Sequence, residues 1–399
     1  MARETAAHAA PSKRRKRLRL FSFATGFDMP FFILVVSILA VGLVCLFSAS
    51  FAYSYYQHGD SYHYISRQLL FAVLGLIGMI AISFLNYEVL GRFSWIVWFV
   101  SLGLLALVLM LPSGTGVRRW IPLGIFNLQA SEVAKFAIIL LFADLISKYQ
   151  ESMRNPMKGF LPFMAILGVT CGLVVVEPHL SGTILLFSIG MVMLFIGGTQ
   201  KRWLIGTLLL GAALVAFMVL ALGYEQDRIA VWRDPIGVYT SNVVYESGQT
   251  GRDVAWQTVQ SLYAIGSGGL MGEGLGNSRQ KHSFLPEPQN DFIFAIVCEE
   301  LGFIGAVIIM ILFAALVWRG IVIGLKAPDK FGSMLTIGLT AQVGLQVIFN
   351  LAVVTNAFPN TGISLPFFSY GGSSLIMLLL QMGIILAVSR QTKQRAEGS

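Results

Sequence analysis

The chain has 399 residues, of which 56% are hydrophobic and only 12% are charged, with a formal net charge of +8 and a mean hydropathy of +0.73. A soluble domain carries roughly a quarter charged residues, so this composition excludes a soluble globular protein and indicates a polytopic membrane protein. All three cysteines lie inside apolar runs, so neither a disulfide framework nor a cysteine-based metal site is indicated.

The chain begins with a basic arm, predicted over residues 1–28, whose positions 13–17 read Lys-Arg-Arg-Lys-Arg. The arm lacks the short apolar core and the cleavage site of a signal peptide. Basic residues that flank a membrane span stay in the cytoplasm. We therefore expect the arm to be cytoplasmic and to bind the anionic inner leaflet rather than a nucleic acid.

Ten apolar segments follow that are long enough, or nearly so, to cross a bilayer. They cover residues 31–49, 69–85, 93–111, 133–147, 160–176, 182–198, 203–222, 292–318, 334–354 and 373–389. The predicted fold is therefore an all-α polytopic membrane protein with ten transmembrane helices and both termini in the cytoplasm. The membrane domain is predicted over residues 29–390 and a cytoplasmic tail over residues 391–399.

One loop is long, residues 223–290 between the seventh and eighth spans, and the predicted topology makes it extracytoplasmic. The basic residues support this topology. Of the 28 Lys and Arg residues, 19 fall on the predicted inner side and 8 on the outer side, with Lys135 inside a span. An excess of positive charge in the cytoplasm is the rule for multispanning proteins.

Asp291 stands at the start of the eighth span, and Arg279, Lys281 and Glu287 lie within the dozen residues before it. An acid and two cations at a membrane boundary, next to a glycine-rich stretch, suggest chemistry on a substrate that is polar at one end and apolar at the other. A structural role is the alternative, because Asp is a favoured helix N-cap. The glycine-rich stretch opens no βαβ unit, so a dinucleotide site is rejected.

Further candidates are Glu132, at the boundary of the fourth predicted span, and Lys135, Glu299 and Glu300, which lie inside predicted spans. Charged groups are costly in lipid and default to functional candidates. Glu132 and Lys135 are three residues apart and share a helical face, so they form either a structural ion pair or part of a substrate cavity. Glu299 lies about 80° from Asp291 around a continuous helix axis and could reach deeper into the same cleft, whereas Glu300 points elsewhere.

A polar segment rich in Gly and Ser, residues 360–374, precedes the last span and contains Ser369 and Ser373. Non-helical backbone at a membrane edge is tolerated where it lines protein or a wet cavity. We expect this segment to pack against the long loop, and a plain outer turn is the alternative. His58 and His63, in the first outer loop, are too sparse to predict a metal site.

Together these segments resemble the SEDS family (shape, elongation, division and sporulation) of membrane peptidoglycan polymerases. The resemblance covers nearly the whole chain from residue 30. Its motifs are Arg119-Trp120, Gln129-x-Ser131-Glu132-x-x-Lys135, Gln260-Ser261-Leu262 through Gly276, Leu285-Pro286-Glu287, Asp291-Phe292-Ile293-Phe294, Glu299-Glu300-Leu301-Gly302 and Thr361-Gly362 through Ser374. Gly276-Asn277-Ser278 with Lys281 resembles the division and sporulation branch, typified by FtsW, more than the rod-elongation branch.

The sequence departs from the family pattern in two places. Ala130 stands where the family usually has Pro, which is expected to loosen the start of the fourth span. Glu177-Pro178-His179-Leu180-Ser181-Gly182 replaces a common Pro-Asp-Leu-Gly pattern, so any role of that Asp in relatives is not carried over.

The resemblance implies a peptidoglycan glycosyltransferase that polymerises lipid II at the outer face of the cytoplasmic membrane during cell division. Asp291 is then the general base on the acceptor hydroxyl, and undecaprenyl pyrophosphate leaves in an inverting displacement. The residues expected to bind substrate are Arg119, Glu132, Lys135, Arg279, Lys281, Glu287, Glu299, Ser369 and Ser373. No cofactor is firmly indicated, although cations or a divalent metal, Mg or Mn, would stabilise the pyrophosphate.

The partners implied are lipid II, a class B penicillin-binding transpeptidase and other division proteins, with no nucleic acid. A lipid II flippase and a non-enzymatic scaffold for division proteins are the alternatives. A flippase needs polar groups continuous to the cytoplasmic face, but the candidates cluster on the outer side, with Asp144 the main exception. A scaffold has no need of Asp291.

Overall fold

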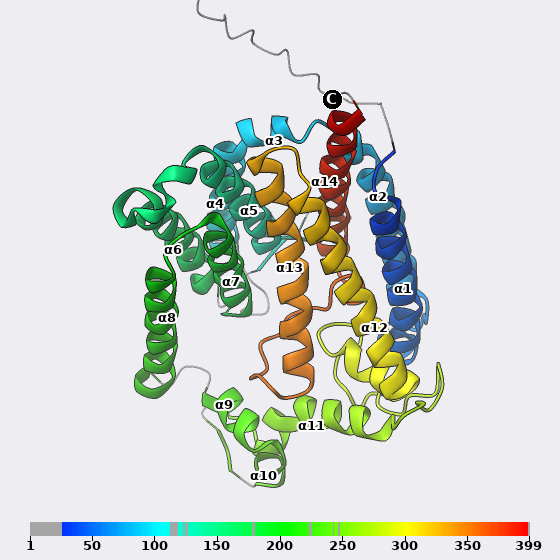
Figure 1. Cartoon of the computed structure of the whole chain (residues 1–399). Helices are drawn as coiled ribbons and strands as arrows, with labels where there is room; N and C mark the ends of the chain where they lie inside the picture. Colours follow the sequence, from blue (N-terminus) through cyan, green and yellow to red (C-terminus); the bar gives the residue numbers. More distant parts are fainter. Residues whose placement is uncertain are drawn as a thin grey trace, which may run out of the picture.

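The computed structural model describes residues 26–111, 119–122, 124, 127–177, 180–222, 226–241, 243–245 and 248–397. The described chain is mostly helical (Figure 1). Its long helices are α1 (Met29–His58), α2 (His63–Ser83), α4 (Ser94–Met110), α5 (Ala130–Lys148), α6 (Leu161–Val176), α7 (Leu180–Gly197), α8 (Lys201–Leu222), α12 (Ile293–Leu325), α13 (Lys330–Val354) and α14 (Gly372–Glu397). The shorter elements are α3 (Glu88–Arg92), β1 (Trp120–Pro122), β2 (Asn127–Gln129), η1 (Gln150–Arg154), η2 (Pro156–Phe160), α9 (Gln226–Arg233), α10 (Pro235–Thr240) and α11 (Gly251–Ser267).

Within the described residues, seven helices are long and apolar enough to cross a membrane. They are α1, α2, α6 with the preceding η2, α7, α12, α13 and α14. The other three predicted spans also coincide with helices, namely α4, α5 and α8. A multispanning helical protein is therefore confirmed, whereas the crossing of all ten helices stays a prediction.

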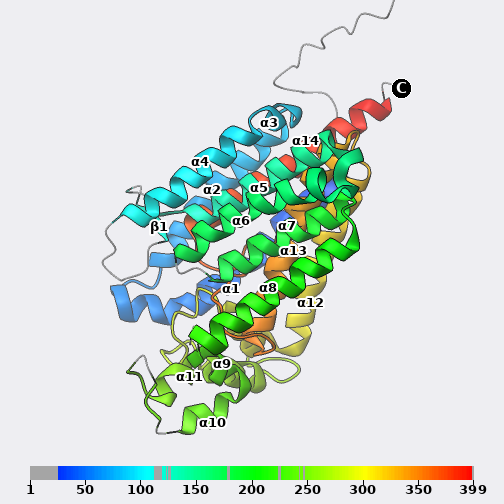
Figure 2. The ribbon, with the colours of Figure 1, turned by 90° about the vertical axis from the view of Figure 1, so that its left-hand side faces the viewer.

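Helix α5 is the central helix of the bundle, which explains why it tolerates charged side chains. Most of its residues are buried, and α4, α7 and α13 pack around it (Figure 2). Protein rather than lipid therefore surrounds Glu132, Lys135 and Asp144. At the opposite extreme, α8 lies at the edge of the bundle and contacts α7 (Figure 1).

The two ends of the described chain lie at the same end of the bundle. The backbone N–H of Asp28, which caps α1, donates to the hydroxyl of Ser389 on α14 at 3.1 Å. The Asp28 carboxylate also pairs with Arg319 of α12 at 2.7 Å. This agrees with an even number of spans. The basic residues 13–17 of the predicted arm lie outside the described residues, as do Arg118 and positions 178–179.

The predicted long loop contains helices of its own. Helices α9, α10 and α11 gather at the end of the bundle opposite α3 and the last turns of α14 (Figure 1). Helix α11 begins with a capping box between Thr250 and Asp253. Val231, Val238, Ala255 and Val259 form a small separate core among these helices.

Helix α12 is interrupted at Gly302, whose φ is 66° and ψ is −170°. The break frees the carbonyls of Glu299 and Glu300 from helical bonding. They accept hydrogen bonds from the backbone N–H groups of Glu273 and Gly274, at 2.9 and 3.0 Å. Hydrogen bonds between backbone groups therefore join the long loop to the part of α12 that precedes Gly302.

Candidate active site

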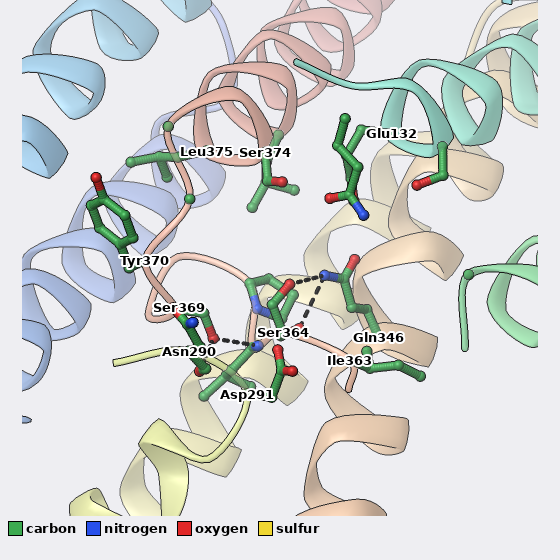
Figure 3. Close-up of a pocket in the computed structure, with 18 of the residues that line it drawn as sticks. Glu132, Asn290, Asp291, Gln346, Ile363, Ser364, Ser369, Tyr370, Ser374 and Leu375 are labelled. Atoms are coloured by element: carbon green, nitrogen blue, oxygen red, sulfur yellow. Dashed lines mark hydrogen bonds between the residues drawn. The ribbon is translucent and has the colours of Figure 1, made fainter. Parts of the chain in front are cut away.

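A cavity of about 680 Å³ lies between the starts of α5, α7, α12 and α14. Its polar and charged lining comprises Arg67, Arg119, Asn127, Gln129, Ser131, Glu132, Lys135, Ser181, Glu287, Asn290, Asp291, Gln342, Gln346, Ser364, Ser369, Tyr370 and Ser374. Figure 3 shows Asp291 close to Ser364, with Glu132 on the other side of the cavity. Six of the ten predicted site residues therefore meet at one cavity, namely Asp291, Arg119, Glu132, Lys135, Glu287 and Ser369.

Asp291 does not cap a helix. The N-cap of α12 is Phe292, and it makes no side-chain capping bond, so the structural alternative for Asp291 is wrong. The carboxylate instead lies against the backbone of Gly362, where an added Cβ would be 3.1 Å from Oδ2. Gly362 has φ +68°, a conformation that favours glycine, and the absent Cβ lets the two chains approach closely.

The surroundings of Asp291 suit a base that works near neutral pH. The pKa of this carboxyl is raised to about 6, mainly by burial and also by the nearby Glu287 carboxylate, while Arg119 opposes the rise. None of the described residues donates a hydrogen bond to the Asp291 carboxylate. Its proton-accepting oxygens are therefore available to a ligand in the cavity.

Backbone bonds join the loop before Asp291 to the segment before α14. The Ser369 hydroxyl donates to the carbonyl of Asn290, and the N–H of Tyr370 donates to the carbonyl of Gln289, both at 2.8 Å. The expected packing of residues 360–374 against the long loop is therefore confirmed. Ser369 lines the cavity while its hydroxyl serves this junction.

Glu132 and Lys135 on α5 form a buried ion pair of 2.7 Å and also line the cavity. The predicted ion pair is therefore confirmed and the pair lines a cavity, whereas its contact with a substrate stays a prediction. Strand β1 pairs antiparallel with β2, with Trp120 opposite Gln129. Because β2 leads directly into α5, this hairpin brings Arg119 to the same wall.

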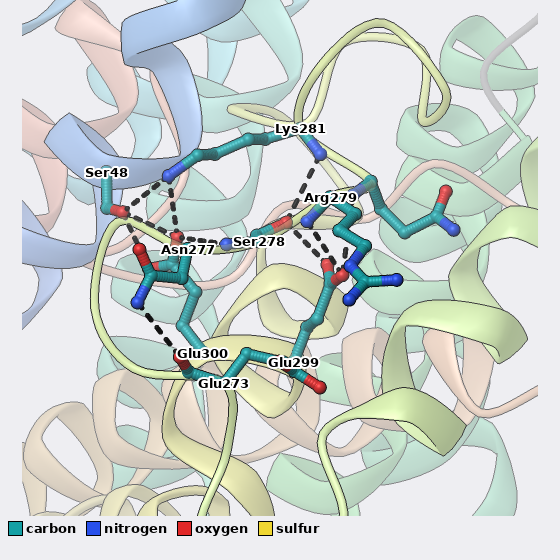
Figure 4. Close-up of polar contacts among 9 residues, drawn as sticks. Ser48, Glu273, Asn277, Ser278, Arg279, Lys281, Glu299 and Glu300 are labelled. Atoms are coloured by element: carbon teal, nitrogen blue, oxygen red, sulfur yellow. Dashed lines mark hydrogen bonds and ion pairs between the residues drawn. The ribbon is translucent and has the colours of Figure 1, made fainter.

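Arg279, Lys281 and Glu299 do not line the cavity. The Lys281 ammonium pairs with Glu300 at 2.9 Å, and both side chains are almost fully buried. Glu299 accepts the backbone N–H of Arg279 at 2.9 Å (Figure 4). The expectation that these residues face the substrate is corrected: two buried carboxylates need donors, and residues 278–281 of the loop supply them.

The Glu300 carboxylate also accepts from the hydroxyl of Ser48 on α1, at 2.6 and 2.7 Å (Figure 4). Glu300 does point away from the cavity, as the sequence predicts. Ser373 is buried but is not part of the lining, although its neighbours Gly372 and Ser374 are.

Several residues that line the cavity were not predicted from the sequence. Arg67 at the start of α2 is one of the eight basic residues on the predicted outer side and was not predicted to bind substrate. Gln342 and Gln346 lie one turn apart on α13 and face the cavity, and two amides at that spacing in an apolar span are the signal that could have identified them. Among the described residues, no group of three His, Cys, Asp or Glu side chains is placed to hold a metal ion. A cation requirement stays a prediction.

The sequence profile of the FtsW/RodA/SpoVE family, described as "Cell cycle protein", matches residues 29–394. Stage V sporulation protein E of Bacillus subtilis is 39% identical over 92% of this chain and 98% of its own length. A probable peptidoglycan glycosyltransferase FtsW of Trichlorobacter lovleyi is 37% identical over 95% of this chain and 96% of its own.

Two solved structures share the fold. One, from work on the "structural coordination of polymerization and crosslinking by a peptidoglycan synthase complex", is 27% identical, with a TM-score of 0.77 over 93% of this chain and 100% of that one. The other is the rod shape determining protein RodA of Thermus thermophilus, 27% identical, with a TM-score of 0.63 over 92% and 97% of the two chains. This chain therefore belongs to the FtsW/RodA/SpoVE family of cell cycle proteins.

Proposed function

We propose that this protein is a peptidoglycan glycosyltransferase that polymerises lipid II into glycan strands, with Asp291 as the general base. One observation carries the assignment of the base. The Asp291 carboxylate lies on the wall of a cavity that is also lined by cationic side chains, and no described residue donates a hydrogen bond to this carboxylate. The activity class agrees with the names of curated relatives, several of which are probable peptidoglycan glycosyltransferases.

The reaction needs one proton acceptor and a stabilised leaving group. The acceptor hydroxyl attacks the anomeric carbon of the donor and forms the new C–O bond, while its proton passes to Asp291. The bond from that carbon to the pyrophosphate breaks, and its electron pair leaves with the phosphate oxygen. A single displacement inverts the α-linked donor to a β-linked strand, so no covalent enzyme intermediate is required.

The lining offers three cations for the departing pyrophosphate. Arg67 and Arg119 lie on the cavity wall, together with Lys135, whose charge is shared with Glu132. Positive groups fixed where negative charge develops lower the barrier without reorganising during the reaction. Arg67 thus joins the predicted Arg119 and Lys135 in the proposed pyrophosphate site, and Arg279 and Lys281 are no longer part of it.

In the proposed disposition, ten helices cross the cytoplasmic membrane, both termini are cytoplasmic, and the cavity faces outward. The excess of basic residues on the predicted inner side supports it. The structural neighbour that comes from a peptidoglycan synthase complex supports a partner transpeptidase. We propose a class B penicillin-binding transpeptidase, with other division proteins as further partners.

The flippase alternative is weaker. Asp144, the main inward candidate, is bonded to Ser94 at 2.9 Å and to Lys148 at 2.7 Å, and it does not line the cavity. Detergent-solubilised protein with its transpeptidase partner should convert lipid II into glycan strands, and Asp291→Asn should not. Translocation of lipid II in sealed vesicles, without polymer from the solubilised protein, would establish the flippase instead.

A further inference from the structure

Asn350 lies fully buried on α13, where the segment that carries Asp291 meets the segment before α14. Its side-chain amide donates two hydrogen bonds of 2.7 Å, one to the carbonyl of Asp291 and one to the carbonyl of Ile363. The Asn350 side chain therefore binds the backbone of both segments.

The carbonyls of Asp291 and Ile363 lie next to the place where the two segments come close together. Gly362, which directly precedes Ile363, is the residue whose backbone lies against Oδ2 of Asp291. The position of the carboxylate relative to Gly362 therefore depends on the bond that Asn350 makes to each segment. The other bonds between these segments, from Ser369 and Tyr370, reach Asn290 and Gln289 and stop short of Asp291.

Asn350 itself is not part of the cavity lining. It can influence a ligand in the cavity only through the groups that it holds. Figure 3 shows Asp291, Ile363 and Ser364 next to one another at the cavity, so both segments held by Asn350 present groups to it.

We propose that Asn350 is a positioning residue for Asp291, which fixes the distance between the carboxylate and the backbone at Gly362. This inference rests on the proposed glycosyltransferase function, in which Asp291 takes the acceptor proton. Without the amide, residue 291 is no longer bonded to α13, and its carboxylate moves away from the acceptor hydroxyl. A displacement of about 1 Å costs on the order of a hundredfold in rate.

Two substitutions test the role of the amide. Asn350→Ser keeps a small hydroxyl donor but cannot reach both carbonyls. Asn350→Asp keeps the shape and places acceptor oxygens against two carbonyls. The matched control is Asn360→Ala, which removes a side-chain bond of 3.1 Å from the same segment to Gln257 on α11 and does not touch Asp291.

The first measurement is the rate of lipid II polymerisation by the solubilised protein with its transpeptidase partner. We expect Asn350→Ser to lower kcat at least tenfold, with KM for lipid II changed less than threefold, and Asn350→Asp to lower kcat further. Asn360→Ala should keep wild-type kcat. A kcat for Asn350→Ser within twofold of wild type overturns the proposal, as does a loss that only follows the fraction of folded protein. If Asn350→Asp does not fold, Asn350→Ser decides alone.

The second measurement does not depend on activity. Hydrogen–deuterium exchange should show faster exchange in peptides that cover residues 289–292 and 362–370 of Asn350→Ser, with no such change in Asn360→Ala. Unchanged exchange in these peptides overturns the inference. If the wild type makes no glycan strands, the proposed function fails, and the exchange result alone decides whether Asn350 holds Asp291.

Discussion

Replacing Asp291 with asparagine should abolish polymerisation and, at neutral pH, make the folded protein more stable. Asn has almost the same size as Asp but cannot accept the acceptor proton. The stability gain follows from the raised pKa of Asp291, which burial, with a smaller contribution from Glu287, shifts from 3.8 to about 6. At roughly 1.4 kcal/mol for each pKa unit, keeping this carboxylate charged in the folded protein costs about 3 kcal/mol.

The sign of the pH dependence follows from linkage. Because the folded pKa lies above the unfolded one, the folded state binds more protons between pH 3.8 and about 6. The contribution of Asp291 to stability is therefore fully present below pH 3.8 and is lost as the pH rises through about 6. The Asp291→Asn variant has no proton to lose at this position, so it should gain its full advantage above pH 6 and little at pH 4.

The assay is the apparent melting temperature of detergent-solubilised protein, followed by intrinsic fluorescence at pH 7.5 and pH 4. We expect Asp291→Asn to melt several degrees above wild type at pH 7.5 and close to it at pH 4. Asp253→Asn is the control of opposite sign, because hydrogen bonds from Thr250 lower the pKa of Asp253 and favour its charged form. A variant that is not stabilised at pH 7.5, or that is equally stabilised at pH 4, would refute the argument from burial.

Three further predictions concern the neighbours of Asp291 and the loop. The value of kcat/KM should fall on the acid side near pH 6, where Asp291 becomes protonated. Glu287→Gln should move this fall to lower pH and Arg119→Gln should move it to higher pH, because Glu287 raises the pKa of Asp291 and Arg119 lowers it. Shifts of the two variants in the same direction would contradict this. Exchanging Glu132 and Lys135 should restore the stability lost in each single variant. Polymerisation should stay low, because the exchange moves the lysine ammonium away from the proposed pyrophosphate site. Full recovery of activity would show that the pair is purely structural. Lys281→Met should lower the melting temperature strongly, because a buried Glu300 without its ion-pair partner costs about 3–5 kcal/mol. The double variant of Lys281→Met with Glu300→Gln should recover most of that loss. A Lys281→Met protein that melts like wild type would show that the ion pair adds no stability.

The sequence predicted most of the fold because the apolar segments of a membrane protein are long and distinct. Each of the ten predicted segments coincides with a helix. The cavity was predicted in part, since charged residues such as Glu132, Lys135 and Asp291 are conspicuous in or beside apolar runs. Amides are weaker signals, which is why Gln342 and Gln346 were missed although they line the same cavity.

The misplacement of Glu299 has a specific cause. The angle of about 80° between Asp291 and Glu299 assumes one continuous helix, but α12 begins at Ile293 and Asp291 lies before it. The pairing of Lys281 with Glu300 is equally hidden from the sequence, because the loop approaches α12 only where the helix is broken.

The break at Gly302 connects the fold of the loop to the position of the proposed base. An added Cβ at residue 302 would lie 2.3 Å from the backbone nitrogen of Gly272, and φ 66° is itself unfavourable for other residues. A continuous helix would keep the carbonyls of Glu299 and Glu300 for its own bonds and release the loop that they now bind. The same loop leads to Asp291, so the glycine that interrupts α12 supports one side of the proposed active-site cavity. Asn350 supports the other side from α13, and the costly burial of one carboxylate is sustained by backbone contacts on both sides.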